Sequence, residues 1–270
     1  MSAASVFLID GSKGLRMAAD VKAKRAAFRK LHDAGCFVLP NPWDIGSVRR
    51  LERLGFAALA TTSSGFAWAM GREDGEMSRD EVLGHMREIC EATDLPVNAD
   101  FEAGFADTAK DVGRNVALAV KTGVAGLSIE DRVGAELYDL ELACERIRAA
   151  REAIDASGED VLLVGRSEGF LVGRTELSAT IERLVAYAEA GADCLYAPGI
   201  REASDIAAVV SAVAPKPVNA LLLAGMRVAD LAAAGARRVS VGGGLAAAAW
   251  AGFDRAARQL INEGTVPPRG

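Results

Sequence analysis

Eight short apolar runs, separated by segments with helical periodicity, constrain the fold of this chain more than any other feature. None of the runs alternates strongly between polar and apolar residues, which is typical of strands buried on both faces of a parallel sheet. They lie at 37–39, 57–61, 97–100, 125–129, 161–165, 193–197, 218–221 and 238–241. The helical segments between them lie at 79–92, 109–121, 142–156, 178–190, 203–213 and 228–234. The alternation predicts an α/β fold with a parallel sheet.

A weak internal repeat supports this order. Gly55, Gly123, Gly191 and Gly235 each stand at a helix end just before a strand, where glycine can adopt the left-handed conformation that ends a helix. We therefore predict a (β/α)8 TIM-type barrel, with an open doubly wound sheet as the alternative. Residues 1–19 are expected to form a flexible N-terminal extension. Residues 20–270 are expected to form one barrel domain, which includes an amphipathic helix over 20–35 and an Ala-rich helix over 245–264.

Composition narrows the classes of partner and compartment. The net charge is −6, from 31 basic and 37 acidic residues, and basic clusters are scarce, which argues against nucleic acid and anionic membrane surfaces as partners. No apolar run reaches the roughly 18 residues needed to span a bilayer. The four cysteines are far apart and lack metal-ligand spacing, which predicts reduced thiols in a cytoplasmic protein. Two histidines are too few for a histidine-rich metal site.

The stretch Val97–Phe105 carries the most informative polar residues. It leaves an apolar strand and places Asn98, Asp100 and Glu102 at alternating positions. A period of two puts these side chains on one face of an extended segment. Two carboxylates and an amide on one face of a buried strand are paired or bind a cation, unless the strand simply runs out into a solvated loop.

In a barrel of this type, functional residues lie just past the carboxyl ends of the strands. These positions hold carboxylates after the third and fourth strands, an arginine after the fifth and hydroxyls after the second. In chain order they are Asn41, Trp43 and Asp44; Thr62, Ser63, Ser64 and Gly65; Asn98, Asp100 and Glu102; Glu130, Asp131 and Arg132; Arg166, Ser167 and Glu168; Tyr196; Asn219; and Gly242, Gly243 and Gly244. Together they predict an acidic pocket that also contains an anion clamp.

The chemistry of this set favours a magnesium-assisted reaction on a small acid. Mg²⁺ takes one or two carboxylates, while substrate and water fill its other positions. A 2-oxo or 2-hydroxy acid would chelate the metal, Arg166 could bind a carboxylate with two hydrogen bonds, and Ser64 with the Gly65 N–H could donate to another anionic oxygen. Two alternatives remain open. Glu130, Asp131 and Arg166 could form only a structural salt bridge, and the triple glycine at 242–244 could hold phosphate or form a tight turn.

Several segments resemble the isocitrate lyase/phosphoenolpyruvate mutase superfamily, from about Lys24 to the C-terminal helix. They are residues 39–44 (Leu-Pro-Asn-Pro-Trp-Asp), 63–65 (Ser-Ser-Gly), 71–74 (Gly-Arg-Glu-Asp), 98–100 (Asn-Ala-Asp) with Gly104 and Phe105, 129–131 (Ile-Glu-Asp) and 164–166 (Val-Gly-Arg). The resemblance implies a barrel whose members cleave or form C–C or P–C bonds next to a 2-oxo acid through a metal-stabilised enolate. It also implies that the last helix is exchanged between subunits, usually in a tetramer.

The resemblance assigns roles to individual residues. Mg²⁺, or Mn²⁺ in its place, is expected at a site formed by Asp100 and Glu130 together with Asn98 and Glu102. Asp74, Glu130 and Arg166 are expected to take part in catalysis. The expected substrate-binding residues come from four strand ends: Trp43, Asp44, Ser63, Ser64, Gly65, Arg166 and Asn219.

Two departures from the family pattern stand out. The first aspartate of the family motif is Asn98 here, and an extra residue brings in Glu102, which could supply the missing charge. The isocitrate and methylisocitrate lyases carry a cysteine in a mobile loop after the Glu-Asp pair, whereas residues 132–138 contain none and lead almost directly into the next helix. Cys144 lies within that helix and is expected in the core.

We therefore expect a Mg²⁺-dependent carbon–carbon lyase of the cysteine-lacking branch. It would act on a small 2-oxo or 2-hydroxy carboxylate by retro-aldol cleavage or decarboxylation. The alternatives are P–C bond chemistry on a phosphonopyruvate-like substrate and an inactive carboxylate-binding barrel. Trp250, Phe253 and Ala257 form one stripe on the last helix, which predicts a homo-oligomer, a dimer or a tetramer, although the stripe could also pack on its own barrel.

Overall fold

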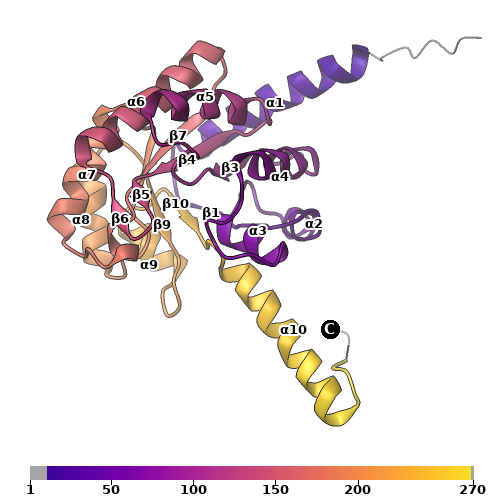
Figure 1. Ribbon diagram of the computed structural model, residues 1–270. Helices are drawn as coiled ribbons and strands as arrows, with labels where there is room; N and C mark the ends of the chain where they lie inside the picture. The colour runs from indigo at the N-terminus through magenta and orange to yellow at the C-terminus, as the bar shows by residue number, and fades with distance from the viewer. Residues whose placement is uncertain (1–10, 269–270) are drawn as a thin grey trace, which may run out of the picture.

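Eight parallel strands form the centre of the molecule (Figure 1). The computed structural model describes residues 11–268, with side chains from Asp20 onward. The strands are β1 (Phe37–Leu39), β2 (Leu59–Ala60), β3 (Val97–Asp100), β4 (Gly126–Glu130), β7 (Leu162–Arg166), β8 (Cys194–Tyr196), β9 (Val218–Leu221) and β10 (Arg238–Ser240). Their spatial order is β1-β10-β9-β8-β7-β4-β3-β2. The Ala60 N–H donates to the Pro40 carbonyl at 3.0 Å, joining β2 to the end of β1, so the barrel is nearly closed, as the sequence predicted.

Helices surround this barrel. They are α1 (Gly11–Leu31), α2 (Ile45–Arg53), α3 (Ser63–Ala69), α4 (Arg79–Glu91), α5 (Ala109–Val120), α6 (Leu140–Ser157), α7 (Leu177–Glu189), α8 (Ala203–Val213), α9 (Val228–Ala233) and α10 (Gly244–Glu263), with a 3₁₀ helix η1 (Gly169–Val172). An antiparallel hairpin of β5 (Arg132–Val133) and β6 (Glu136–Leu137) stands between β4 and α6. The short segment after β4 is therefore folded into a hairpin before the next helix begins.

The N-terminal region differs from the expectation. Helix α1 begins at Gly11 and not near Asp20, so half of the expected extension is helical. Residues 1–10 of that extension lie outside the described residues. Phe28 of α1 is fully buried in a cluster with Ala58, Ala125 and Leu162, which precede or begin strands. Helix α1 therefore closes the amino end of the barrel, opposite to the end at which a site is expected.

Two helices that the periodicity did not reveal, α2 and α3, are set by their caps. The Asp44 carboxylate accepts from the Ser47 N–H at 2.6 Å and the Ser47 hydroxyl accepts from the Asp44 N–H, a reciprocal capping box. Thr62 caps α3 by accepting from the Gly65 N–H at 3.3 Å. Both caps satisfy backbone donors at helix starts next to the carboxyl ends of β1 and β2.

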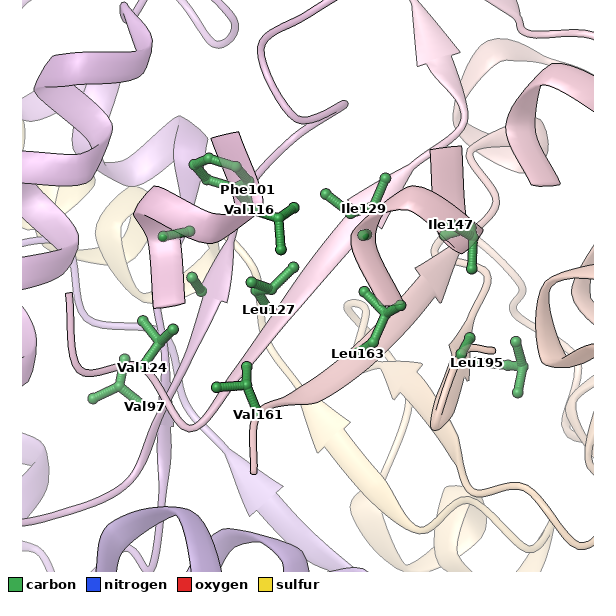
Figure 2. Close-up of a cluster of buried hydrophobic side chains, with 14 of the residues drawn as sticks. Val97, Phe101, Val116, Val124, Leu127, Ile129, Ile147, Val161, Leu163 and Leu195 are labelled. Carbon is green, nitrogen blue, oxygen red and sulfur yellow. The ribbon is translucent and has the colours of Figure 1, made fainter. Parts of the chain in front are cut away.

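The main core lies between the strands and the outer helices (Figure 2). Leu127 and Ile129 of β4 and Leu163 of β7 are at most 1 % exposed, and they pack with Val116 of α5 and Ile147 of α6. Alternate residues of the same strands point into the barrel. This alternation sends the polar Ser128, Glu130 and Arg166 toward the interior. All four cysteines are unpaired, and Cys144 is buried in the core as expected.

Helix α10 projects away from the barrel (Figure 1). Among its residues Ala246 is buried, whereas Trp250, Phe253 and Ile261 are 39 %, 63 % and 80 % exposed. Trp250 and Phe253 contact each other edge to face, with ring centroids 6.0 Å apart. The helix therefore leaves its apolar stripe uncovered by its own chain. Over residues 11–268, no helix combines the length and apolar character that crossing a bilayer requires.

Candidate active site

A polar cavity of about 180 Å³ opens at the carboxyl ends of the strands. Each of the eight barrel strands contributes at least one residue to its lining, and the residue from β4 is Ser128. Its lining includes the polar residues Asn41, Thr61, Thr62, Ser63, Ser64, Asp74, Asn98, Asp100, Ser128, Arg166, Tyr196, Asn219, Arg238 and Ser240. The location agrees with the prediction from the barrel architecture.

Three carboxylates surround Arg166, the last residue of β7. Its Nη1 lies 3.2 Å from Asp100 Oδ1 and 3.3 Å from Glu130 Oε2, and its Nε lies 2.5 Å from Glu168 Oε1. The register of the sheet causes this meeting, because Glu130 of β4 pairs directly with Arg166 of β7. The ring centroid of Tyr196 lies 5.3 Å from the guanidinium carbon of Arg166. Arg166 is therefore the cation at the centre of an acidic cluster.

The start of α3 fixes Asp100. The backbone N–H and hydroxyl of Ser63 donate to Asp100 Oδ2 at 3.2 and 3.1 Å. The Asp100 N–H donates to Thr61 Oγ1 at 2.8 Å. One carboxylate oxygen is thus held by α3 and the other by Arg166, so the orientation of Asp100 is determined on both sides.

Electrostatics in the cluster are dominated by crowded carboxylates. Burial raises the pKa of Glu130 well above its usual range, and the neighbouring Glu168 and Asp100 add to the shift. Burial also raises the pKa of Glu102 to about 8, with further contributions from Asp100 and Asp74. Glu102 Oε1 is buried and has no hydrogen-bond partner among the described residues. Both carboxyl groups are therefore harder to ionise than usual in the free site, and a bound cation would stabilise their charged form.

The backbone explains why Glu102 does not share the face of Asn98 and Asp100. Strand β3 ends at Asp100, and Glu102 lies in the following turn with a positive φ of 46°. The period of two therefore stops two residues earlier than the sequence analysis assumed. Arg146 of α6 holds this turn, since its guanidinium donates to the carbonyls of Ala103, Ala106 and Asp107.

The structure gathers most of the expected residues. Those that line the cavity are Asp74, Asn98, Asp100, Ser63, Ser64, Arg166 and Asn219. Glu130 contacts Arg166 just behind the lining. Trp43 and Asp44 do not line the cavity, and Asp44 is exposed and caps α2. The Gly65 N–H, expected to donate to a substrate, instead donates to Thr62. A Cβ on Gly65 would lie 2.7 Å from Thr62 Cγ2 and 3.0 Å from Trp43 Cβ, so close packing explains this glycine.

Three residues of the site were not assigned a role from the sequence. Glu168 follows β7 and pairs with Arg166, Tyr196 ends β8 and lines the cavity, and Arg238 begins β10 and also lines it. Glu168 and Tyr196 stand at strand ends, and this position already marked them as candidate pocket residues. Arg238 was hidden because it was read as the first residue of an apolar strand, although a charged residue inside such a run is itself unusual.

An acidic pocket built around an arginine, at the carboxyl end of a parallel barrel, is typical of barrel enzymes that act on small anions. The family model described as phosphoenolpyruvate phosphomutase matches residues 28–261. The chain belongs to the isocitrate lyase/phosphoenolpyruvate mutase superfamily. This confirms the resemblance seen in the sequence and makes the chain an enzyme of a superfamily whose named members are lyases and mutases.

Three relatives illustrate the match. The crystal structure of a Burkholderia cenocepacia J2315 protein, assigned as a lyase/mutase, is 44 % identical with a TM-score of 0.89, covering 92 % of this chain and 91 % of that one. Escherichia coli K12 2-methylisocitrate lyase is 35 % identical over 162 residues, 56 % of this chain and 53 % of its own length. Oxaloacetate acetylhydrolase, solved with the product oxalate, is 25 % identical with a TM-score of 0.84, covering 92 % of this chain and 90 % of that one.

The family is generally dependent on a divalent metal, and the residues present are compatible with one. Within residues 20–268, no group of three or more His, Cys, Asp or Glu side chains is arranged as a ready metal site. Mg²⁺ commonly uses only one or two carboxylates, with water and substrate completing its shell. Asp100 and Glu130 supply two converging carboxylates, and the unpartnered Glu102 oxygen lies in the same crowded region. The donor set therefore fits a hard divalent cation.

Proposed function

We propose that this enzyme cleaves a C–C bond in a small 2-oxo or 2-hydroxy carboxylic acid, by retro-aldol cleavage or decarboxylation, with Mg²⁺ as cofactor and Mn²⁺ as a substitute. The observation that supports this most is the cluster of Asp100, Glu130 and Glu168 around Arg166 at the cavity. It combines the oxygen ligands of a hard cation with a guanidinium suited to a carboxylate. A cavity of about 180 Å³ also suits a small acid and not a large one.

Asp100 and Glu130 would hold the metal directly, with Glu102 and Asp74 acting through water. When bound, the metal supplies positive charge where an enolate oxygen develops, which lowers the barrier without a proton transfer. Arg166 has one terminal nitrogen, Nη2, that makes no hydrogen bond to a described residue, and this nitrogen would bind and orient the substrate carboxylate. Ser64 would donate to another anionic oxygen from the wall formed by α3.

Tyr196 is a candidate proton donor, because the cysteine acid of the related lyases is missing here. Burial raises the pKa of Tyr196 to about 12, so its hydroxyl stays protonated at neutral pH. Its side chain lines the cavity beside Arg166. The hydroxyl can therefore give a proton to a carbanion at this wall and recover it from solvent.

The test is a panel of 2-oxo and 2-hydroxy diacids, assayed for pyruvate- and oxaloacetate-derived products with Mg²⁺ and with a chelator. We expect turnover of at least one diacid that is lost with the chelator and in the Asp100→Asn variant. The matched control is Glu145→Gln, which removes an exposed carboxylate of α6 and should retain full activity. Turnover that is unaffected by both the chelator and Asp100→Asn would contradict the proposal.

The same assay separates the two alternative functions. Including phosphonopyruvate and measuring released phosphate or formed phosphoenolpyruvate would reveal P–C bond chemistry. Binding of oxalate without turnover of any diacid or phosphonate would instead indicate a carboxylate-binding barrel without catalysis.

We also propose that the enzyme works as a homo-oligomer, a dimer or a tetramer built from dimers. The apolar stripe of α10 supports this, because Trp250 and Phe253 are exposed on a helix that its own barrel does not cover. A second copy of the chain is the partner that the C-terminal helix would contact.

A further inference from the structure

The floor of the cavity contains a second arginine whose charge the protein does not neutralise. Arg238 begins β10, is 3 % exposed, and still lines the cavity. Its Nε donates to Asn219 Oδ1 at 2.9 Å, and its Nη1 donates to Asn98 Oδ1 at 3.2 Å. Both acceptors are amide oxygens, which orient the guanidinium but bring no negative charge.

Arg238 differs in this respect from Arg166. Among residues 20–268, no carboxylate lies within 4.0 Å of the Arg238 guanidinium, whereas three lie that close to Arg166. Burial lowers the pKa of Arg238, and the side chains that oppose this shift are the weak acids Cys194 and Tyr196 and not a carboxylate. A buried cation without an anionic partner is strongly unfavourable, so an anion in the cavity would stabilise it.

The surroundings of Arg238 are arranged to keep the guanidinium available. Asn219 donates through Nδ2 to Ser240 Oγ at 2.9 Å, which fixes the amide so that its oxygen faces Arg238. Asn98 donates through Nδ2 to the Ala99 carbonyl at 3.1 Å, which fixes its amide in the same way. The Nη2 nitrogen of Arg238 has no acceptor among the described residues. It is the donor that an anion in the cavity would meet.

We propose that Arg238 forms a carboxylate subsite at the floor of the cavity, with Asn98 and Asn219 as its positioning residues. This rests on the proposed function in taking a carboxylate as the ligand. A small diacid would place one carboxylate at Arg238, while its other end lies at Asp100, Glu130 and Arg166. Asn98 then belongs to the floor subsite and not to the metal-binding carboxylates. An aspartate at position 98 would pair with Arg238 and displace the ligand.

The subsite can be tested by calorimetric titration of malonate into the full-length protein in a buffer with chelator, so that no metal contributes. We expect Arg238→Gln to weaken malonate binding at least tenfold. Asn98→Asp should produce a similar loss while keeping the fold, because it replaces the ligand's charge with a carboxylate from the chain. The matched control is Ser128→Ala, a cavity residue that donates to the Ala99 carbonyl and not to Arg238, and its affinity should stay within twofold of wild type.

Three results would overturn the proposal. The first is a folded Arg238→Gln or Asn98→Asp protein that binds malonate as tightly as wild type does. The second is a wild-type protein that does not bind malonate. The third is chloride that binds as tightly as malonate, which would show that the site does not select a carboxylate. Failure of this test is distinguishable from failure of the proposed function. The Arg238 subsite is tested by malonate affinity in the absence of metal. The proposed function is tested by metal-dependent turnover that requires Asp100.

Discussion

At the scale of single residues, the carboxylates of the site gather around one arginine at the open end of the barrel, and a second arginine lies apart from them. Asp100, Glu130 and Glu168 surround Arg166 at the open end, and Arg238 lies at the floor among amides. This separation gives an elongated anion two different ends to bind. The predictions for individual side chains follow from it.

Removing Asp100 should weaken metal binding. Asp100→Ala takes away one of two converging carboxylates and leaves Ser63 without its acceptor, so we expect at least a tenfold loss of Mn²⁺ affinity in calorimetry or paramagnetic relaxation. Glu130→Ala should behave in the same way. Unchanged Mn²⁺ affinity in both variants would remove these two residues from the metal site.

Replacing Arg166 by lysine keeps the charge but removes the planar guanidinium. A lysine cannot contact Asp100, Glu130 and Glu168 while also presenting a donor to substrate, so we expect weaker oxalate binding and a raised KM for a carboxylate substrate. The measurement is oxalate titration with Mn²⁺ present. If Arg166→Lys binds oxalate as tightly as wild type, the role of Arg166 in holding the carboxylate is wrong.

His85 should make the fold sensitive to acid. Burial lowers its pKa to about 4, and it stacks on Phe66 with ring centroids 3.9 Å apart. The folded state keeps His85 neutral, so the unfolded chain binds an extra proton below its ordinary pKa near 6.5. The contribution of neutral His85 to the free energy of unfolding is complete above about pH 6.5 and is lost as the pH falls toward 4. At pH 5 the expected loss is about 2 kcal/mol.

Urea unfolding at pH 7.5 and pH 5 tests this effect in wild type and in His85→Leu. The leucine variant should lose about 2 kcal/mol less than wild type between these pH values. His32, whose pKa burial also lowers to about 4, is present in both proteins and serves as an internal control. Equal losses in the two proteins would contradict the assignment.

At the scale of elements, strand–helix packing was predictable from the sequence, whereas the short capped helices were not. The runs at 37–39, 97–100 and 218–221 match β1, β3 and β9 at both ends, because buried parallel strands are continuous apolar segments. Helices α2 and α3 carry too few residues for a clear periodicity. Their starts depend on the caps at Asp44 and Thr62, which the sequence analysis had assigned to the predicted pocket.

The residues of the candidate site also divide into those that the sequence predicted and those that it did not. Residues at strand ends, such as Asp100 and Arg166, were predictable because the topology alone brings them together. Glu102 was misplaced because the backbone turns after Asp100 with a positive φ, which the alternation of side chains does not reveal. Arg238 was missed because its role depends on what faces it across the barrel, namely Asn98 on β3. Sequence spacing contains no information on such a contact.

A glycine in β7 permits close packing of α7. A Cβ on Gly165 would lie 2.9 Å from Tyr187 Cβ and 3.2 Å from Ala192 Cβ, so Gly165→Ala should push α7 away and destabilise the protein by about 1–3 kcal/mol. The control is Gly84→Ala in α4, where nothing lies within 4 Å of the added Cβ. That variant should be as stable as wild type or up to about 1 kcal/mol more stable. Urea unfolding measures both, and equal stability of the two variants would contradict the packing argument.

At the scale of the whole molecule, α10 is the element through which we propose that the chain associates. Burying Trp250 and Phe253 against a second copy would remove on the order of 150–250 Å² of apolar surface from water for each ring. At about 25 cal/mol per Å² this amounts to several kcal/mol per helix. The assembly should therefore persist at micromolar concentration.

Light scattering at micromolar concentration should show a dimer or a tetramer for the full-length chain. The double variant Trp250→Ser with Phe253→Ser should dissociate or aggregate, because the apolar stripe is lost. Arg255→Ser changes an exposed side chain on another face of α10 and should leave the oligomer intact. A folded monomer of the full-length wild-type chain would rule out the proposed assembly.

The start of α10 touches the wall of the catalytic cavity. Gly243 lies so close to α3 that a Cβ on it would come within 2.7 Å of Ser64 Oγ, and Ala246 lies against Gly65. One rigid helix thus joins the lining of the pocket to the surface expected to meet another subunit. These contacts lie within one chain, so a partner that binds α10 in the proposed oligomer would add a second constraint on the position of Ser64. The activity per subunit would then increase with the concentration of the protein.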